Sequence, residues 1–238
     1  MRRRADIQRE LDFRASKWGG RRLGAGRKKT GRAVGPAHRA RPAHKRSEPV
    51  HVVLRVVKRE GRLRRGKILA VVRRVLRVTV ERPGFRIVHT SMQHNHLHLI
   101  VEAESKAALS AGMQITASLL ARAINRAWGR RGKLFAHRYH ATALSTPRQC
   151  RNALAYVLNN WRRHNEDKRG VIEQHTALDP YATGMHFDGW RERVDLRALG
   201  AGFEPLPAAP PQTWFLREGW RRGGAPLSQW AEPGAMPS

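Results

Sequence analysis

Apolar side chains recur with two different spacings between residues 51 and 164, and these spacings predict the order of helices and strands. Runs that are β-branched, or that alternate between apolar and polar residues, are typical of strands. Strands are predicted in this way at residues 51–57, 85–92, 96–103 and 134–144. Apolar residues three and four positions apart, with arginines on the outer side, are typical of amphipathic helices. Helices are predicted at residues 62–77, 107–128 and 147 to about 164.

The predicted elements follow the order strand, helix, strand, strand, helix, strand, helix. Two βαβ-like halves around a central hairpin predict an α+β fold, a ferredoxin-like or RRM-like sandwich with a central antiparallel sheet and helices on one face. The last helix is additional to that plan. It begins where Ser145 or Thr146 can cap it and where Pro147 suits the first helical position. We expect this helix to lie where it reaches the two central strands.

The segments that flank this pattern differ from it in composition. Residues 1–47 are rich in Arg, Lys, Gly and Ala, so they lack the apolar surface that would offset the entropy of ordering, and they are predicted to form a basic, disordered arm. Such an arm can bind phosphate groups without sequence specificity, or it can serve only to keep the chain soluble. Residues 48–165 hold the predicted domain, and residues 166–238 are predicted to form a weakly structured C-terminal extension. The tryptophans of the extension either pin it to the core or stack on unpaired bases: Trp190, Trp214, Trp220 and Trp230.

The 238 residues carry a formal net charge of +29. A protein this basic is expected to bind a polyanion, with nucleic acid favoured over a membrane surface. No apolar run approaches the roughly 20 residues that a membrane-spanning helix needs, and a signal peptide is not expected. Cys150 is the only cysteine, which excludes an intramolecular disulfide and a cysteine-rich zinc site. The expected location is therefore the cytoplasm, in association with the nucleoid.

Two histidines share one face of the predicted strand at 96–103. Side chains two residues apart in a strand project to the same side, so His96 and His98 lie next to each other while the neighbouring leucines face a core. Two adjacent imidazoles on a rigid strand can supply half of a divalent metal site, or they can simply face water. His94 would be a third ligand only if the strand were continuous from residue 94 onward.

The predicted last helix carries a second polar pair. Tyr156 and Asn160 are four residues apart, so they lie one turn apart on the same side of the helix. A phenol beside a divalent metal is what phosphoryl transfer through a phosphotyrosine needs, because the cation polarises the phosphate and helps to remove the phenolic proton. Tyr156 is thus the candidate nucleophile, and the candidate metal ligands are His96, His98 and the carbonyl oxygen of Asn160.

Other residues are weaker candidates for these roles. Tyr139 lies on a predicted strand with a less suitable spacing to any helper amide or histidine, and Tyr181 lies in the C-terminal extension. His137 and His140 fall on opposite faces of their strand and are expected to pack or to contact DNA phosphates. Glu102 shares the face of the paired histidines, but it lies roughly 13 Å along the strand from the second of them, too far to join the same site.

With these residues in place, the chain resembles a known family, the single-tyrosine HUH transposases, and in particular the REP-associated tyrosine transposases. The motif NHLHLIVEA places the histidine pair of that family at His96 and His98. The segment LAYVLNNWRRH resembles its tyrosine helix, with Tyr156 as nucleophile and Asn160 one turn further on. GRRGKLFAHRYHATAL resembles the strand before that helix, and the basic GGRRLGAGRKKTGRA resembles the leader of many members.

The resemblance covers roughly residues 48–165 and implies an activity. It implies an endonuclease and strand transferase that depends on Mg²⁺ or Mn²⁺, acts on single-stranded or hairpin DNA of the REP type, and passes through a 5′-phosphotyrosine. It is compatible with a monomer or a homodimer. The alternative is a non-catalytic nucleic-acid-binding protein, either a domesticated transposase or a module that binds RNA or DNA through the same sheet and basic arm.

Overall fold

Five strands form one antiparallel sheet in the computed structural model, which describes residues 44–57, 62–168, 176–200 and 202–234. The strands are β1 (Val50–Arg55), β2 (Glu81–Arg82), β3 (Phe85–Met92), β4 (His96–Ala103) and β5 (His140–Ala143). Their order across the sheet is β2-β3-β4-β1-β5, and every pairing is antiparallel. The strand with the paired histidines, β4, therefore lies at the centre of the sheet, between β3 and β1.

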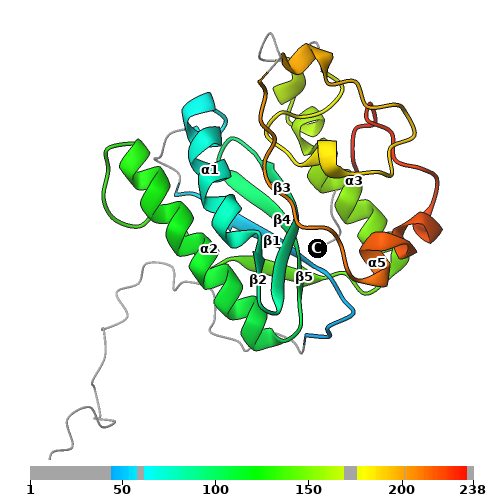
Figure 1. Ribbon diagram of the computed structural model, residues 1–238, viewed down its shortest axis with the longest axis horizontal. Coiled ribbons are helices and arrows are strands. Elements are labelled where there is room, and N and C mark those ends of the chain that lie inside the picture. Colours follow the sequence, from blue (N-terminus) through cyan, green and yellow to red (C-terminus); the bar gives the residue numbers. More distant parts are fainter. Residues whose placement is uncertain (1–43, 58–61, 169–175, 201, 235–238) are drawn as a thin grey trace, which may run out of the picture. The chain divides into compact units, whose positions relative to one another are not determined.

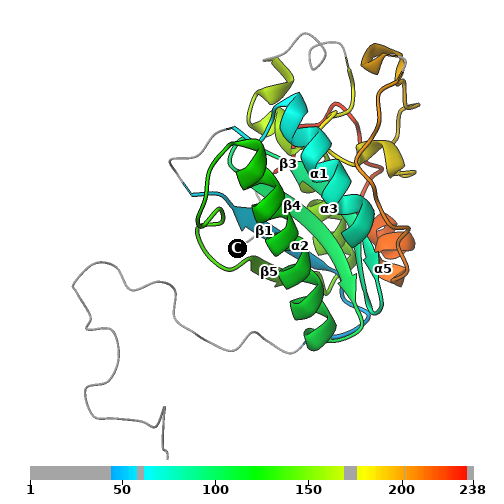
Figure 2. The same ribbon diagram turned by 60° about the vertical axis from the view of Figure 1, so that its left-hand side comes forward.

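Helices cover both faces of this sheet (Figure 1). The long helices are α1 (Gly66–Thr79), α2 (Lys106–Ala127) and α3 (Pro147–Arg163). The helices α1 and α2 lie side by side on one face, and α3 lies on the other face, as a second view shows (Figure 2). The predicted α+β fold with a central antiparallel sheet is confirmed. The additional helix α3 does reach the central strands, as expected.

Capping residues fix where two of these helices begin. The hydroxyl of Ser105 accepts a hydrogen bond from the backbone N–H of Ala108 at the start of α2. The hydroxyl of Thr146 accepts one from the N–H of Gln149 at the start of α3, which has Pro147 at its first position. Thr146 rather than Ser145 is thus the cap of α3.

Strand alternation separates two apolar cores. In β4, Leu97, Leu99 and Val101 face the first core together with the inner sides of α1 and α2, whereas Ile100 faces the second core beneath α3. Val88 of β3 joins Ile100 there. The side chains of α3 in the second core are Cys150, Ala153, Leu154, Val157 and Leu158. The polar side of α3 is therefore held at a fixed position over the centre of the sheet.

The strand predicted at 134–144 is shorter than expected. Phe135 forms an isolated bridge to Val56, residues 136–138 bend away, and regular pairing with β1 resumes only at His140. Leu134 and Phe135 nevertheless lie in the first core. The apolar run predicted a continuous strand because residues are buried both before and after the bend at 136–138.

The C-terminal extension has only short helical segments among its described residues, yet it contributes to both cores. Its segments are η1 (Glu166–Lys168), η2 (Gly184–His186), η3 (Arg197–Leu199), α5 (Trp214–Arg217) and η4 (Gly219–Gly223). Leu206 lies in the first core, and Leu216 and Trp220 lie in the second. Of the other tryptophans, Trp214 is 43% exposed and Trp230 is 60% exposed. Packing therefore explains Trp220, but it does not account for the exposed rings.

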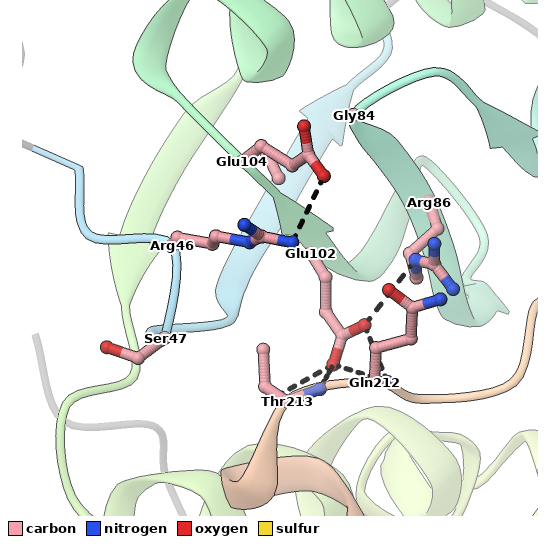
Figure 3. Close-up of a pocket in the computed structure, with 9 residues that line it drawn as sticks. Arg46, Ser47, Gly84, Arg86, Glu102, Glu104, Gln212 and Thr213 are labelled. Atoms are coloured by element: carbon pink, nitrogen blue, oxygen red, sulfur yellow. Dashed lines mark hydrogen bonds and ion pairs between the residues drawn. The ribbon is translucent and has the colours of Figure 1, made fainter.

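A buried carboxylate ties the extension to the far end of β4 (Figure 3). Glu102 accepts hydrogen bonds from the backbone N–H groups of Gln212 and Thr213 and from the Thr213 hydroxyl. Arg86 pairs with it at 3.7 Å. These groups line a pocket of about 500 Å³, where Arg46 also pairs with Glu104. Glu102 therefore has a structural role, away from the paired histidines.

One helix bears on the expectation about membrane spans. By length and composition alone, α2 is apolar enough to cross a membrane, with a mean hydropathy of 1.2 over an 18-residue window. One stripe of α2 is buried and packs in the first core: Leu109, Met113, Leu120 and Ile124. This packing buries 33% of the apolar window.

Candidate active site

Strand pairing brings a third histidine to the predicted pair. β1 runs antiparallel to β4, with Val53 opposite His98 and His51 opposite Ile100. Diagonal neighbours on one face of such a pair are within reach of aromatic side chains. His51 and His98 stack with ring centroids 5.2 Å apart, and His96 stands edge-on to His98 with centroids 4.5 Å apart. Three imidazoles from two strands therefore form one cluster.

Hydrogen bonds join these rings into a chain that ends at Asn95. The amide oxygen of Asn95 can only accept, so Nδ1 of His96 carries a hydrogen and donates it over 2.7 Å. In a neutral His96 the Nε2 atom then holds a lone pair, which accepts from Nε2–H of His98 over 2.8 Å. Nδ1 of His98 in turn accepts from Nε2–H of His51 over 3.0 Å. Each ring is neutral in this arrangement.

Burial favours these neutral forms. Desolvation, aided by neighbouring cationic groups, lowers the pKa of His51 and that of His96 from 6.5 to about 4. The same causes lower the pKa of His98 well below its usual range, and this side chain is only 3% exposed. His98 is therefore not a water-facing residue of a surface strand. Neutral imidazoles keep lone pairs that a metal ion can use near neutral pH.

The polar side of α3 faces this cluster. Tyr156, Asn160 and the C-terminal capping residue His164 follow one another at intervals of four residues, so they lie on one side of the helix. The Tyr156 ring stands edge-on to His98 with centroids 5.2 Å apart, and its centroid lies 6.2 Å from that of His51. The ring of His164 lies 6.0 Å from that of His96. The predicted nucleophile and the paired histidines are therefore brought together from segments about 60 residues apart.

Asn160 lies between Tyr156 and His164 along α3, and its amide has no hydrogen-bond partner. Its Oδ1 and Nδ2 atoms are buried, and neither donates to nor accepts from any described residue. The side chain is 0% exposed. Burial of an unsatisfied amide costs free energy, so such a group calls for an explanation, of which an absent ion or water is one.

Two of the three predicted donors, His96 and His98, are close enough to share a divalent cation. The amide of Asn160 lies one turn beyond Tyr156, on the helix that faces them. Two nitrogen atoms 2.8 Å apart are close to the separation of about 3 Å between adjacent ligands of an octahedral ion with bonds of about 2.1 Å. A carboxamide oxygen with no other partner is a suitable hard donor. Over the residues that the structure describes, no group of three or more His, Cys, Asp or Glu side chains is arranged to hold a metal. Asn160 stays the predicted third donor, and the observation that supports this prediction is its buried, unpartnered amide.

A cavity of about 570 Å³ opens beside the cluster. It is lined by Val53, Arg55, Gln93, His94, Asn95, His96, Tyr156, His164 and Glu166. Glu166 supplies the carboxylate of this lining and is 8% exposed. Its Oε2 lies 3.8 Å from Nε of Arg64, which also donates two hydrogen bonds to Asp179. A buried ion network therefore holds an acidic group at the wall of the cavity.

The weaker candidates either lie away from the cavity or lie outside the histidine face of β4. His94 lines the cavity, but it sits in the turn between β3 and β4, so it does not continue the histidine face of the strand. Tyr139 and Tyr181 pack against the first core, and neither lines the cavity. His137 and His140 are exposed.

Several residues of this site escaped the sequence analysis, among them His51 and Glu166. The alternation in the first strand already places His51 on the face opposite Val52, which is buried in the first core. The sequence does not show the register in which this strand pairs with β4. Glu166 lies beyond α3 in a segment without periodicity, so no sequence pattern indicates where its side chain points.

A family model matches the part of the chain that carries the motifs. Residues 46–160, just under half of the chain, match the model of a family described as "Transposase IS200 like". That segment contains both histidines, the tyrosine and the asparagine. No curated protein matches the chain. A solved structure described as a REP-associated tyrosine transposase bound to a REP hairpin aligns with a TM-score of 0.46 and 16% identity, covering 74% of this chain and 93% of that one.

Proposed function

We propose that this chain, whose residues 46–160 match the IS200-like transposases, is a single-tyrosine DNA nuclease and strand transferase with Tyr156 as its nucleophile. The observation that carries the proposal is the meeting of three separate segments at one cavity. Tyr156 from α3 stands 5.2 Å from the ring of His98 on β4, which is hydrogen-bonded to His51 on β1. A tyrosine with only a packing role would not explain why a histidine pair and an unsatisfied buried amide lie next to it.

The reaction proposed for this site exchanges one phosphodiester for another. Oη of Tyr156 attacks the scissile phosphorus, a bond forms between Oη and phosphorus, and the bond from phosphorus to the 3′ oxygen breaks. The phenolic proton passes to water in the cavity, and the leaving 3′ oxygen takes up a proton. The products are a 5′-phosphotyrosine link and a free 3′-hydroxyl. Because the link retains the energy of the phosphodiester, attack by another 3′-hydroxyl can rejoin DNA without a nucleotide cofactor.

His96, His98 and Asn160 are the residues that would hold Mg²⁺ or Mn²⁺. A divalent cation there would supply charge stabilisation to the phosphate and would favour the ionised form of a phenol whose ordinary pKa is about 10. The protein contributes the orientation of Tyr156, because the apolar side of α3 is packed in the second core. The chain thus supplies a fixed nucleophile and a fixed set of neutral donors.

The proposed substrate is single-stranded or hairpin DNA, with REP-type hairpins implied by the family resemblance. The net charge of +29 supports a polyanionic partner. Arg55 lies at the cavity itself, next to the predicted site of attack. The basic arm predicted at 1–47 lies outside the described residues, except for its last four. A location in the cytoplasm with the nucleoid, and action as a monomer or homodimer, belong to the same proposal.

The test is covalent attachment to labelled DNA. The protein is incubated with a single-stranded oligonucleotide that carries a REP-type hairpin, with Mg²⁺ or Mn²⁺ and separately with EDTA. The proposal predicts a band that resists denaturant and that forms only with the metal. Binding of the hairpin with no adduct under any metal condition would instead favour a non-catalytic nucleic-acid-binding protein.

A further inference from the structure

The imidazole of His51 has no task in the reaction proposed above, although it is buried in the centre of the site. Its side chain lies on β1, which pairs with β4 on one side and with β5 on the other, so its backbone is held from both sides. It is 5% exposed, and burial of a polar group costs free energy unless the group is hydrogen-bonded. A buried histidine is therefore expected to have a hydrogen-bond partner.

That partner is His98. Nε2 of His51 lies 3.0 Å from Nδ1 of His98, and the two rings stack with planes 18° apart. The hydrogen bond fixes one nitrogen of His98, and the stacking fixes the plane of its ring. Both constraints point the remaining nitrogen, Nε2, toward Nε2 of His96 at 2.8 Å.

A histidine that binds a metal through one ring nitrogen ordinarily donates a hydrogen bond from the other ring nitrogen to a neighbouring acceptor. This bond sets the tautomer and the orientation of the ring. In the hydrogen-bonded chain of the metal-free protein, His51 donates to Nδ1 of His98. If Nε2 of His98 were to give its lone pair to a cation, the hydrogen of His98 would sit on Nδ1 and would be donated to Nε2 of His51. His51 would then carry its own hydrogen on Nδ1. All three rings would keep one hydrogen, so the change needs no net release of protons.

We propose that His51 is a positioning residue that orients His98 and, by exchanging donor and acceptor roles with it, lets Nε2 of His98 serve as a metal ligand. The inference rests on the proposed function, because it gives His51 a purpose only where His98 binds a cation. It assigns His51 no contact with DNA and no step in the transfer.

Three variants separate this role from a general effect on folding. His51→Phe keeps a flat ring of similar size and removes the hydrogen-bonding nitrogens. His51→Gln keeps an amide that can donate or accept near the position of Nε2. The matched control is His89→Phe, because His89 is also 5% exposed on a strand of the same sheet and also bonds through its ring, to the Thr183 hydroxyl at 3.2 Å.

The first measurement is Mn²⁺ affinity of the full chain without DNA, followed by the electron paramagnetic resonance of free Mn²⁺. Loss of a residue that orients a ligand usually lowers metal affinity about 10- to 100-fold. We expect a loss in that range for His51→Phe, recovery of most of the affinity in His51→Gln, and no change in His89→Phe. Equal affinity in wild type and His51→Phe would overturn the inference, as would an equal loss in the His89→Phe control.

The second measurement reads the tautomer of His98 directly from ¹⁵N–¹H correlations of the imidazoles, with and without Mg²⁺. In the wild type without metal we expect hydrogen on Nε2 of His98, and with Mg²⁺ we expect it on Nδ1. A His98 that does not respond to His51→Gln or to Mg²⁺ contradicts the role of His51 even if His51→Phe fails to fold. If the wild type binds neither ion, the proposed metal chemistry fails. The metal-free spectra still decide whether His51 sets the His98 tautomer.

Discussion

Replacement of Asn160 by leucine is expected to stabilise the metal-free protein. Both amide atoms of Asn160 are buried and lack partners, and leucine has the same branched shape without polar atoms. An unsatisfied buried polar group costs about 1–3 kcal/mol. Imperfect packing of the larger side chain offsets part of the gain, so we expect a net stabilisation of about 2 kcal/mol. In a chain of this size, that raises the melting temperature by about 4–8 °C.

The matched control is the same exchange at the adjacent position. Asn159 is also buried, and its Oδ1 also lacks a partner, but its Nδ2 donates hydrogen bonds to the carbonyls of Ser228 and Ala231. Asn159→Leu leaves both carbonyls without that donor and is expected to destabilise the protein by about 1–3 kcal/mol. Two identical exchanges on neighbouring residues of α3 should therefore act in opposite directions.

The assay is thermal unfolding followed by circular dichroism, in EDTA and in Mn²⁺. A ligand that binds only the folded state raises the melting temperature, so the wild type should gain from Mn²⁺ and Asn160→Leu should gain less. A variant that melts below the wild type in EDTA would show that the amide is already satisfied. An undiminished gain from Mn²⁺ in Asn160→Leu would show that Asn160 is not a ligand.

Three further predictions concern the charges of the chain. Removal of residues 1–40 should weaken hairpin binding and flatten its dependence on salt, because fewer counterions are released; an unchanged slope in a titration from low to high salt would refute this. Arg64→Met should destabilise the protein by about 3–5 kcal/mol in urea unfolding, because Asp179 loses its buried partner, and Asp179→Leu in the same chain should restore most of the loss. The pKa of His51 is lowered to about 4 and that of His89 to about 3, so the unfolded state takes up their protons first as the pH falls below 6.5. The free energy of unfolding should therefore decrease between pH 6.5 and about pH 4, by up to about 1.4 kcal/mol per pH unit for each histidine, and a flat profile over that range would contradict the burial of these rings.

Local patterns predict those parts of the fold whose side chains alternate or recur strictly. The strands at 85–92 and 96–103 are observed as predicted, because their β-branched and apolar residues suit strands that are buried on both faces. The start of α3 follows from Thr146 and Pro147, which act within one helical turn. The helix predicted from residue 62 begins only at Gly66, because Arg65 is extended and Arg64 turns inward to its ion network.

Contacts between remote segments account for what the sequence could not predict. His51 joins the site only through the register of β1 on β4, and a slip of one residue would turn it to the opposite face. Trp220 and Leu206 are buried by segments that have no regular period, so their burial depends on the surfaces that the rest of the chain presents. The candidate nucleophile and the paired histidines were found because each lies on a regular element. Their mutual distance follows from packing alone.

The most direct test of the central claim is to map the amino acid that carries DNA in the covalent adduct. The adduct is formed with a labelled hairpin oligonucleotide in Mn²⁺, digested with protease and nuclease, and analysed by mass spectrometry, with Tyr156→Phe treated in parallel. The account predicts a nucleotide on the peptide that contains Tyr156 and no adduct in the variant, whose folding should be nearly unchanged because only a hydroxyl is lost. A nucleotide on the peptide of Tyr139 or Tyr181, or an adduct that persists in Tyr156→Phe, would contradict it.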